Sequence, residues 1–356
     1  MLTIKTPSKI QDYSSWKDLN IFSAKLKAVQ SLLKYNDRYD DKKKEIICTS
    51  CKKKVHLVYF STGKYKWDSF LYHIVNEHQY KPDKIFINFI MEFNVTIPTN
   101  IKNITTFNSK QYTINDLKYV KLTRNQLMIF DALMEHGGYK KKYHSYSKKK
   151  LYYRHSEHSG LLDFDNNGLE RVIVSGRTDR KDPNDTSIFL PQNMEDAIDY
   201  EYIFHTHPPT NRPGGRVTEG ILYEFPSVSD IFHFIDHFND GITQGSLIIT
   251  PEGLYNIRKV EFNRNKIKIN ETELMNNMSN IMIEIQDDAI AKYSKNFTNK
   301  IFYSEIAQDK THIHRLNNLL EKYGITVDYF PRSQDNNGSW ILQEIYLPVF
   351  IIEPKR

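Results

Sequence analysis

The stretch that most constrains the fold of this chain contains two histidines one residue apart. It reads Ile-Phe-His-Thr-His-Pro at residues 203–208, an apolar run that ends in a proline. We expect a strand that ends here, and alternation along it turns the imidazoles of His205 and His207 to the same face. Further along, Pro-Ser-Val-Ser-Asp predicts the start of a helix that is capped by Ser227 and carries Asp230 in its first turn. Two imidazoles and one carboxylate would suffice for a catalytic zinc site with a fourth position open to water.

The length and composition bound the class of protein. The 356 residues exceed one ordinary hydrophobic core, so we expect two or three domains. A formal net charge of +6 permits acidic partners without demanding them. The two cysteines, Cys48 and Cys51, exclude a disulfide framework, and no apolar run has the length of a signal-peptide core or a membrane span. We therefore expect an intracellular protein of the cytoplasm or nucleus, not secreted and without a transmembrane segment.

The two cysteines belong to a second candidate metal site. They form a C-x2-C pattern that is followed, after a gap of 21 residues, by His73 and His78 on a predicted helix. Two thiolates on a tight turn and two imidazoles on one helix would close a tetrahedral structural zinc site. The gap is long for a DNA-reading ββα finger, and His56 is an alternative ligand. The plainer alternative is two reduced cysteines and two surface histidines, but in a reducing compartment C-x2-C more often binds metal.

Periodicity predicts the elements around these motifs. Apolar residues at helical spacing predict a helix within residues 16–35, and alternation predicts a strand over residues 85–97. Thr123 opens a capping box, so a helix should follow it up to a stop at Gly137. In the middle of the chain we expect several strands and one helix. The strands cover residues 157–164, 169–175, 187–191 and a stretch that ends at 205, the helix runs from 228 to 240, and a hairpin covers 246–257.

The remaining sequence offers weaker signals. Lys140 to Lys150 is the densest basic patch and carries interleaved aromatic residues, so nucleic-acid contact is conceivable, but a solvated loop is favoured. After residue 270 the pattern predicts two helices and a closing strand pair around residues 335–338. His312 and His314 repeat the H-x-H spelling, but on a helix residues two apart do not face each other, so we do not assign a metal there.

Five positions, taken in order, resemble the pattern of the JAMM/MPN-plus zinc metallopeptidases. That pattern is a glutamate at the start of a strand, then H-[ST]-H-P, then S-x-x-D. Here Glu157, residues 205–208 and residues 227–230 match it, in predicted structural settings of the expected kind. The resemblance covers roughly residues 120 to 265 and includes a Thr-Pro-Glu-Gly hairpin.

The chain departs from this pattern in one place. Nineteen residues, Pro208 to Pro226, separate His207 from Ser227, where the family usually has a much shorter loop. Surface loops lengthen at small entropic cost, so the site can survive the insertion. Its segments Pro208-Pro209, Pro213-Gly214-Gly215 and Ile221-Leu222-Tyr223 are candidates for a lid or a docking surface.

The resemblance assigns roles to the matched residues. It implies zinc held by His205, His207 and Asp230, with Glu157 as general base and acid and Ser227 as hydrogen-bond donor to the oxyanion. Each assignment has an alternative. Ser227 and Asp230 also form a capping box, Glu170 competes with Glu157, and His233 and His237 are substitute ligands that we expect instead on the helix surface.

With the resemblance, the predicted fold class is α/β (α+β) and multidomain, around a central MPN-like mixed sheet flanked by helices. Residues 1–118 form an N-terminal region with a zinc-finger-like module at about residues 46–80. Residues 119–267 form the metallopeptidase-like domain, and residues 268–356 a mainly helical region with a terminal strand pair.

The implied function is hydrolysis of peptide or isopeptide bonds in conjugates of ubiquitin or a ubiquitin-like protein. The implied cofactor is one catalytic zinc, with a second structural zinc if the cysteine module binds metal. The alternative from another class is a non-catalytic MPN-like scaffold that holds partners through this domain and a structural zinc module. Protein partners of the terminal regions and a nucleic-acid role for the basic residues are compatible with either.

Overall fold

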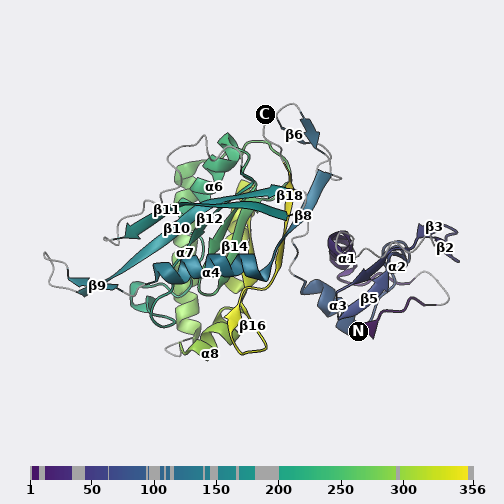
Figure 1. Cartoon of the computed structure of the whole chain (residues 1–356), viewed down its shortest axis with the longest axis horizontal. Helices are drawn as coiled ribbons and strands as arrows, with labels where there is room; N and C mark the ends of the chain where they lie inside the picture. The colour runs from purple at the N-terminus through teal and green to yellow at the C-terminus, as the bar shows by residue number, and fades with distance from the viewer. Residues whose placement is uncertain are drawn as a thin grey trace. The chain divides into compact units, whose positions relative to one another are not determined.

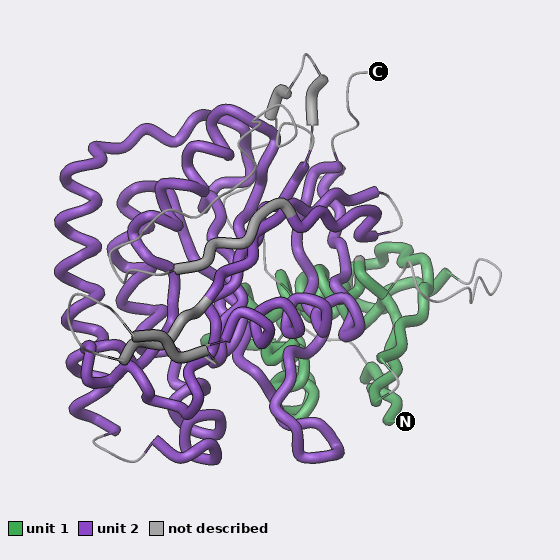
Figure 2. The backbone as a smooth tube through the Cα atoms, turned by 60° about the vertical axis from the view of Figure 1, so that its left-hand side comes forward, with its two compact units in different colours: residues 1–97 green, residues 98–356 purple. Residues whose placement is uncertain are grey.

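The computed structural model describes most of the chain: residues 2–7, 13–33, 45–62, 64–93, 95, 105–107, 110–112, 116–138, 141–144, 151–165, 168–180, 200–293 and 297–351. The chain divides into two compact units, Met1–Ile97 and Pro98–Arg356 (Figure 2).

The first unit is small and combines helices with short strands. Its helices are α1 (Leu19–Leu33), α2 (Ser69–His78) and α3 (Lys84–Met91). Strands β1 (Leu2–Thr3), β5 (Tyr65–Asp68) and β4 (Tyr59–Ser61) form one sheet in that order, and β2 (Glu45–Ile47) and β3 (Lys54–His56) form a separate antiparallel hairpin. The predicted helix within residues 16–35 is confirmed by α1.

The predicted strand over residues 85–97 is wrong, because residues 84–91 form helix α3. Asp83 caps this helix by accepting a hydrogen bond from the backbone N–H of Ile85. The residues that enter the core are Phe86 and Ile90, four apart and both fully buried, whereas Ile85 is 67% exposed. Because the run is apolar on nearly every side, it matches the two-residue period of a strand as well as the period of a helix. The burial of Phe86 and Ile90, four residues apart, selects the helix.

The second unit is built on one mixed sheet (Figure 1). Its strands lie in the order β11 (Gly168–Arg180), β10 (Leu151–Asp165), β12 (Tyr202–Thr206), β13 (Gly245–Ile249), β14 (Gly253–Lys259) and β15 (Ile325–Pro331), and β9 (Lys141–His144) also pairs with β10. Only the β12–β13 pair is parallel among these, and it is joined through helix α6 (Val228–Asp240). The predicted strand pair after residue 156, the strand that ends near His205, and the hairpin over 246–257 are confirmed.

Alternation along the strands gives the sheet two buried faces. On one face Phe204, Leu247, Ile249 and Leu254 pack with Phe130 of helix α4 (Arg124–Gly137). On the opposite face, Ile248, Tyr255 and Val327 pack in a second core with three helices: α6, α7 (Glu271–Tyr293) and α9 (Thr311–Leu320). His205 differs by one position from Phe204 and therefore faces the α6 side of the sheet.

Shorter elements complete the second unit. Strands β8 (Leu117–Leu122) and β18 (Ile345–Phe350) pair with each other, as do β6 (Thr105–Phe107) with β7 (Lys110–Tyr112), and β16 (Ser333–Gln334) with β17 (Trp340–Ile341). Short helical turns are η2 (Val217–Glu219), α8 (Asn299–Ile301), η3 (Phe302–Ile306) and η4 (Glu321–Tyr323). The capping box at Thr123 and the strand pair around residues 335–338 are as predicted.

The predicted boundary between residues 267 and 268 does not divide the structure into units. Residues 98–356 form one unit because β15 pairs with β14 and because α7 and α9 share the core of the central sheet. Two sequence predictions lie wholly or partly outside the described residues: the strand over 187–191, and the basic patch Lys140–Lys150, of which residues 141–144 form β9. Within the described part of the chain, no helix has the length and apolar character needed to cross a membrane.

Candidate metal centre

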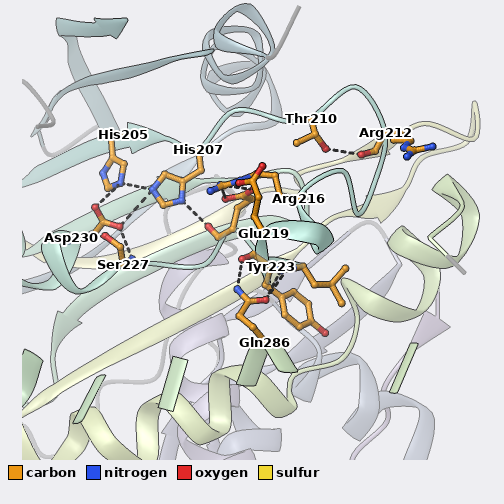
Figure 3. Close-up of polar contacts among 12 residues, drawn as sticks. His205, His207, Thr210, Arg212, Arg216, Glu219, Tyr223, Ser227, Asp230 and Gln286 are labelled. Carbon is orange, nitrogen blue, oxygen red and sulfur yellow. Dashed lines mark hydrogen bonds and ion pairs between the residues drawn. The ribbon is translucent and has the colours of Figure 1, made fainter. Parts of the chain in front are cut away.

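The structure brings His205, His207 and Asp230 together at the C-terminal end of β12, an interior strand of the second unit's sheet (Figure 3). His205 Nε2 lies 3.1 Å from His207 Nε2 and 3.2 Å from Asp230 Oδ1. His207 Nε2 lies 3.5 Å from Asp230 Oδ2. Asp230 is 1% exposed, and among the described residues its Oδ1 has no polar partner other than His205 Nε2. A buried carboxylate needs polar or cationic partners, and a bound cation would supply one.

Strand β12 and helix α6 position these three residues. Thr206 is the last residue of β12, and the backbone N–H of His207 continues the ladder by donating to Ile249 O. Ser227 is the N-cap of α6: its hydroxyl accepts from the N–H of Asp230, and the Asp230 carboxylate accepts from the N–H of Ser227 at 2.6 Å. This reciprocal capping box holds Asp230 in the first helical turn, pointing back to the strand end.

The orientation of His207 depends on the insertion. Its Nδ1 donates a hydrogen bond to the backbone carbonyl of Glu224 at 2.7 Å, which turns Nε2 toward His205 and Asp230 (Figure 3). Burial opposes a charge on His207, but the hydrogen bond and charge of Asp230 outweigh it and raise the pKa of His207 to about 9. Against the same burial, the two imidazoles hold the pKa of Asp230 well below its usual range. The Asp230 carboxylate is therefore ionised, and cationic groups beside it are stabilising.

Glu157 lies on β10, next to β12, and is 6% exposed. The antiparallel register pairs Ser159 with His205, so these two side chains share a face of the sheet. Glu157 is two residues before Ser159 and points to that same face, and its charge contributes to the raised pKa of His207. Its competitor Glu170 is exposed on β11, near the turn of the β10–β11 hairpin.

Gly160 explains the close approach of β10 and β12. A Cβ atom at this position would lie 2.0 Å from Ile173 O and 2.5 Å from the ring of Phe204, so only glycine fits. The pairing of β10 with β11 also shifts register between Ser159 and Gly160. Such irregularities re-aim neighbouring side chains and are common beside functional sites.

The insertion is only partly a surface loop. Leu222 and Tyr223 are buried in the core, and the side chain of Gln286 on α7 binds their backbone, accepting from both N–H groups and donating to Tyr223 O (Figure 3). The prediction that Ile221-Leu222-Tyr223 belongs to a lid or docking surface is therefore wrong for Tyr223, which lies in the core. Residues 209–220 carry the exposed part, where Arg216 pairs with Glu219 and Glu224.

The alternative ligands do not join this group. His233 and His237 lie on α6 outside it, and His237 is buried rather than on the helix surface; burial lowers its pKa to about 4. His312 is buried on α9, where its Nδ1 donates to Asp309 O and its Nε2 lies 3.1 Å from Tyr255 Oη. Burial lowers the pKa of His312 to about 4 as well.

The first unit holds a second group of side chains that could bind a metal ion: Cys48, Cys51, His73 and His78. Cys48 Sγ lies 3.2 Å from His78 Nε2, and Cys51 Sγ lies 3.4 Å from His73 Nε2. Burial opposes ionisation of Cys48, but hydrogen bonds from the Cys51 backbone and the His73 side chain outweigh it and lower the pKa of the thiol to about 6. The alternative ligand, His56, is exposed on β3 and lies outside the group.

Local geometry explains how this second group forms. The cysteines lie in the turn of the β2–β3 hairpin, where Lys52 N–H donates to Cys48 O and Cys48 N–H donates to Lys53 O. Lys52 takes a left-handed conformation with φ of 61°, which turns the chain sharply after Cys51. The histidines lie on α2, which is capped by Asp68 through the N–H groups of Phe70 and Leu71.

Sequence patterns did not predict the contacts by which the insertion supports the candidate metal centre. The Glu224 contact uses a backbone carbonyl, which any residue provides, and Gln286 lies more than fifty residues from the backbone it binds. Neither contact leaves a pattern in the sequence. Arg216 and Glu224, eight apart in a loop, carry no helical or strand spacing that would predict their pairing.

The fold and the two groups define a mixed α/β protein with two candidate metal sites, one in each unit. The chain is 35% identical over 322 residues to “Uncharacterized protein R413” of Acanthamoeba polyphaga mimivirus, a match that covers 88% of this chain and 86% of the viral protein. The chain belongs to the same family as this mimivirus protein. No family model and no solved structure matches the chain.

Proposed function

We propose that the protein is a zinc-dependent peptidase or isopeptidase with an MPN-like catalytic domain, and that His205, His207 and Asp230 hold the catalytic zinc. The observation that carries this proposal is the close approach of two imidazole nitrogens and a buried carboxylate beside a buried glutamate. The resemblance of Glu157, H-x-H-P and S-x-x-D to the JAMM/MPN-plus metallopeptidases supports the same reaction class.

The spacing of the three ligands is compatible with zinc. Zinc bonds to nitrogen and oxygen of ~2.05 Å in a tetrahedron imply ligand atoms about 3.3 Å apart. The two imidazole nitrogens are 3.1 Å apart, and they lie 3.2 Å and 3.5 Å from Oδ1 and Oδ2 of Asp230, respectively. Three protein ligands also leave the fourth position open, as catalytic zinc sites require.

The chain's own residues then divide the chemistry of hydrolysis. When bound, zinc would supply Lewis acidity toward a water and toward the scissile carbonyl. Glu157, on the face shared with the histidines, would accept a proton from the attacking water and give it to the leaving amine. Ser227 would donate a hydrogen bond to the developing oxyanion. In the structure the Ser227 hydroxyl lies 2.8 Å from Ser229 Oγ, so its O–H would have to turn toward the substrate to make this hydrogen bond.

The proposed substrate class is a conjugate of ubiquitin or a ubiquitin-like protein, in which an isopeptide bond joins a C terminus to a lysine amine. This part rests on the resemblance. The Cys48, Cys51, His73 and His78 group is proposed as a structural zinc site, since four protein ligands with two thiolates leave no open position.

The test compares cleavage of ubiquitin chains of defined linkage by wild-type protein and the Glu157→Gln variant, with zinc content measured on the same samples. Wild-type protein should cleave at least one linkage, and Glu157→Gln should keep its zinc while losing roughly 100-fold or more of the rate. Glu170→Gln is the matched control and should remain active.

Zinc-loaded wild-type protein that cleaves no chain would contradict the proposed substrate and favour the scaffold alternative. An active Glu157→Gln variant beside an inactive Glu170→Gln variant would instead reassign the base.

A further inference from the structure

A polar cavity of about 160 Å³ lies beside the candidate metal centre in the second unit. Four segments far apart in the sequence form it. They are Glu135 of α4, residues 209–216 of the insertion with Ile221, Leu222 and Glu224, the turn after β13 at Pro251 and Glu252, and the α8–η3 segment at Asn299, Phe302 and Tyr303. A single water needs only ~15 Å³ of such space, so the cavity has room for a much larger group, such as an amino-acid side chain.

Glu224 joins the cavity to the metal centre. Its backbone carbonyl accepts the hydrogen bond from His207 Nδ1, and the residue also lines the cavity. A group in the cavity would therefore lie next to the element that orients a proposed zinc ligand, close enough to belong to the same substrate.

The charges in the cavity leave one buried carboxylate incompletely satisfied. Arg216 binds both carboxylate oxygens of Glu224, at 3.0 and 2.8 Å, so these two charges offset each other. Glu252 is fully buried, its Oε1 accepts from Tyr255 Oη at 3.0 Å, and its Oε2 has no hydrogen-bond partner within the described residues. Burial, and next the charge of Glu224, raises the pKa of Glu252 to about 7, so a cation beside it would be stabilising.

The other charged residues of the cavity lie at its rim. Glu135 and Arg212 are both exposed to solvent, where water and salt screen their charges. The walls carry the apolar residues Ile221, Leu222 and Phe302. An apolar wall with a buried carboxylate matches a side chain that has an aliphatic stem and a cationic end.

We propose that this cavity binds a basic side chain of the polypeptide substrate, with Glu252 as the residue that selects it. This inference rests on the proposed function in one respect, since it treats the ligand as part of a substrate. The preference of the cavity for a basic side chain requires no hydrolysis. It makes Glu252 a specificity residue supplied by the β13–β14 turn, and the insertion a wall of the binding site.

The test uses the full-length, zinc-loaded protein and two neutral-backbone probes, N-acetyl-lysine methylamide and N-acetyl-norleucine methylamide, titrated by NMR or calorimetry. The two probes share a four-carbon stem and differ in the ammonium group. Wild-type protein should bind the lysine probe about tenfold or more tightly, since a buried charge-assisted hydrogen bond distinguishes them. Glu252→Gln should reduce this preference to about twofold or less, because the amide keeps the Tyr255 hydrogen bond without the charge.

Glu305→Gln is the matched control, because Glu305 is exposed on η3 and does not line the cavity. It should keep the lysine preference. Equal binding of the two probes to wild-type protein, or a preference that persists in Glu252→Gln, would overturn the inference.

A second variant covers the case in which Glu252→Gln does not fold. Asn299→Trp fills the exposed rim of the cavity and should abolish binding of the lysine probe; binding at wild-type strength would overturn the inference. Ubiquitin-chain cleavage is measured separately. A lysine preference without any cleavage would refute the proposed function and leave the cavity assignment standing, and cleavage without the preference would do the reverse.

Discussion

The two candidate metal sites use different ligands in different local settings. In the first unit, four side chains with two thiolates approach from a hairpin turn and one helix, and Cys48 and His78 are buried. In the second unit, two imidazoles and one carboxylate meet at a strand end and a helix N-terminus, beside Glu157 and near a cavity. The first arrangement offers four ligands, enough to enclose an ion, and the second offers three, which would leave one position for another group.

Ligand number and neighbouring residues distinguish the two proposed roles, stabilisation in the first unit and chemistry in the second. We expect a metal held by all four ligands to stabilise the first unit, because it would join the β2–β3 hairpin to helix α2. The second unit has two large cores on either side of its sheet and holds its ligands by ordinary structural devices, a capping box and a strand ladder. We therefore expect metal loss to unfold the first unit and to inactivate the second.

The largest expected effect is loss of folding in the first unit. Cys48→Ser should remove one zinc per chain and unfold residues 1–97, because structural zinc contributes apparent binding free energies of about 10–16 kcal/mol. Zinc analysis and limited proteolysis would follow this. His56→Ala, outside the group, is the control and should leave both zincs in place. A first unit of Cys48→Ser that resists protease as well as wild type would contradict the structural role.

For Asp230→Asn in the second unit we expect loss of activity without loss of folding. It should remove the other zinc and lower hydrolysis on the order of 10³-fold, since metal catalysis supplies several kcal/mol of transition-state stabilisation. The midpoint of thermal unfolding should change little, because the asparagine oxygen can still accept from the N–H of Ser227. Asp236→Asn, exposed on the same helix, serves as control. Unfolding of the second unit in Asp230→Asn would erase the distinction between the two sites.

A smaller effect is expected when the hydrogen bonds that hold the insertion against α7 are removed. Gln286→Ala removes three hydrogen bonds to the backbone of Leu222 and Tyr223 and should destabilise the second unit by about 2–3 kcal/mol. Because the freed loop carries Glu224, zinc affinity at His207 should fall roughly tenfold. Competition with a zinc chelator measures this. Asn276→Ala, exposed on the same helix, should have no effect, and an unchanged chelator profile for Gln286→Ala would show that the loop does not hold His207.

The smallest effect concerns pH. His312 in the second unit is held neutral, with its pKa lowered from 6.5 to about 4 by burial. The unfolded chain takes up the proton first as the pH falls, so this histidine contributes stability above pH 6.5 and loses it between pH 6.5 and 4, by at most about 3 kcal/mol. His312→Phe should flatten the pH dependence of urea unfolding in that window. An unchanged slope would mean that His312 is not the group that titrates.

Local sequence signals predicted much of the candidate metal centre. The H-x-H alternation places both imidazoles on one face, and the S-x-x-D spacing gives a capping box at Ser227, because each signal concerns residues within one turn or a few strand positions. The Cys48 to His78 group was found in the same way, from ligand types and spacing. Each half of these motifs depends on residues close together in the sequence, so the sequence alone contains the signal.

The errors arose where tertiary contacts decide. Residues 84–91 are apolar on nearly all sides, and only packing of Phe86 and Ile90 into the core selects helix. The C-terminal residues share the sheet because β15 pairs with β14, about seventy residues away along the chain. Tyr223 was predicted to lie on a lid or docking surface but is buried, because its hydrogen-bond partner, Gln286, is distant in the sequence.

Anomalous diffraction at the zinc absorption edge, from crystals of the purified full-length protein, tests the central claim most directly. We predict two peaks per chain. One should lie ~2.3 Å from the sulfurs of Cys48 and Cys51, and the other about 2.0–2.2 Å from the Nε2 atoms of His205 and His207 and from an oxygen of Asp230. A single peak at the cysteines, with none between His205, His207 and Asp230 in zinc-replete protein, would contradict the account of a catalytic centre.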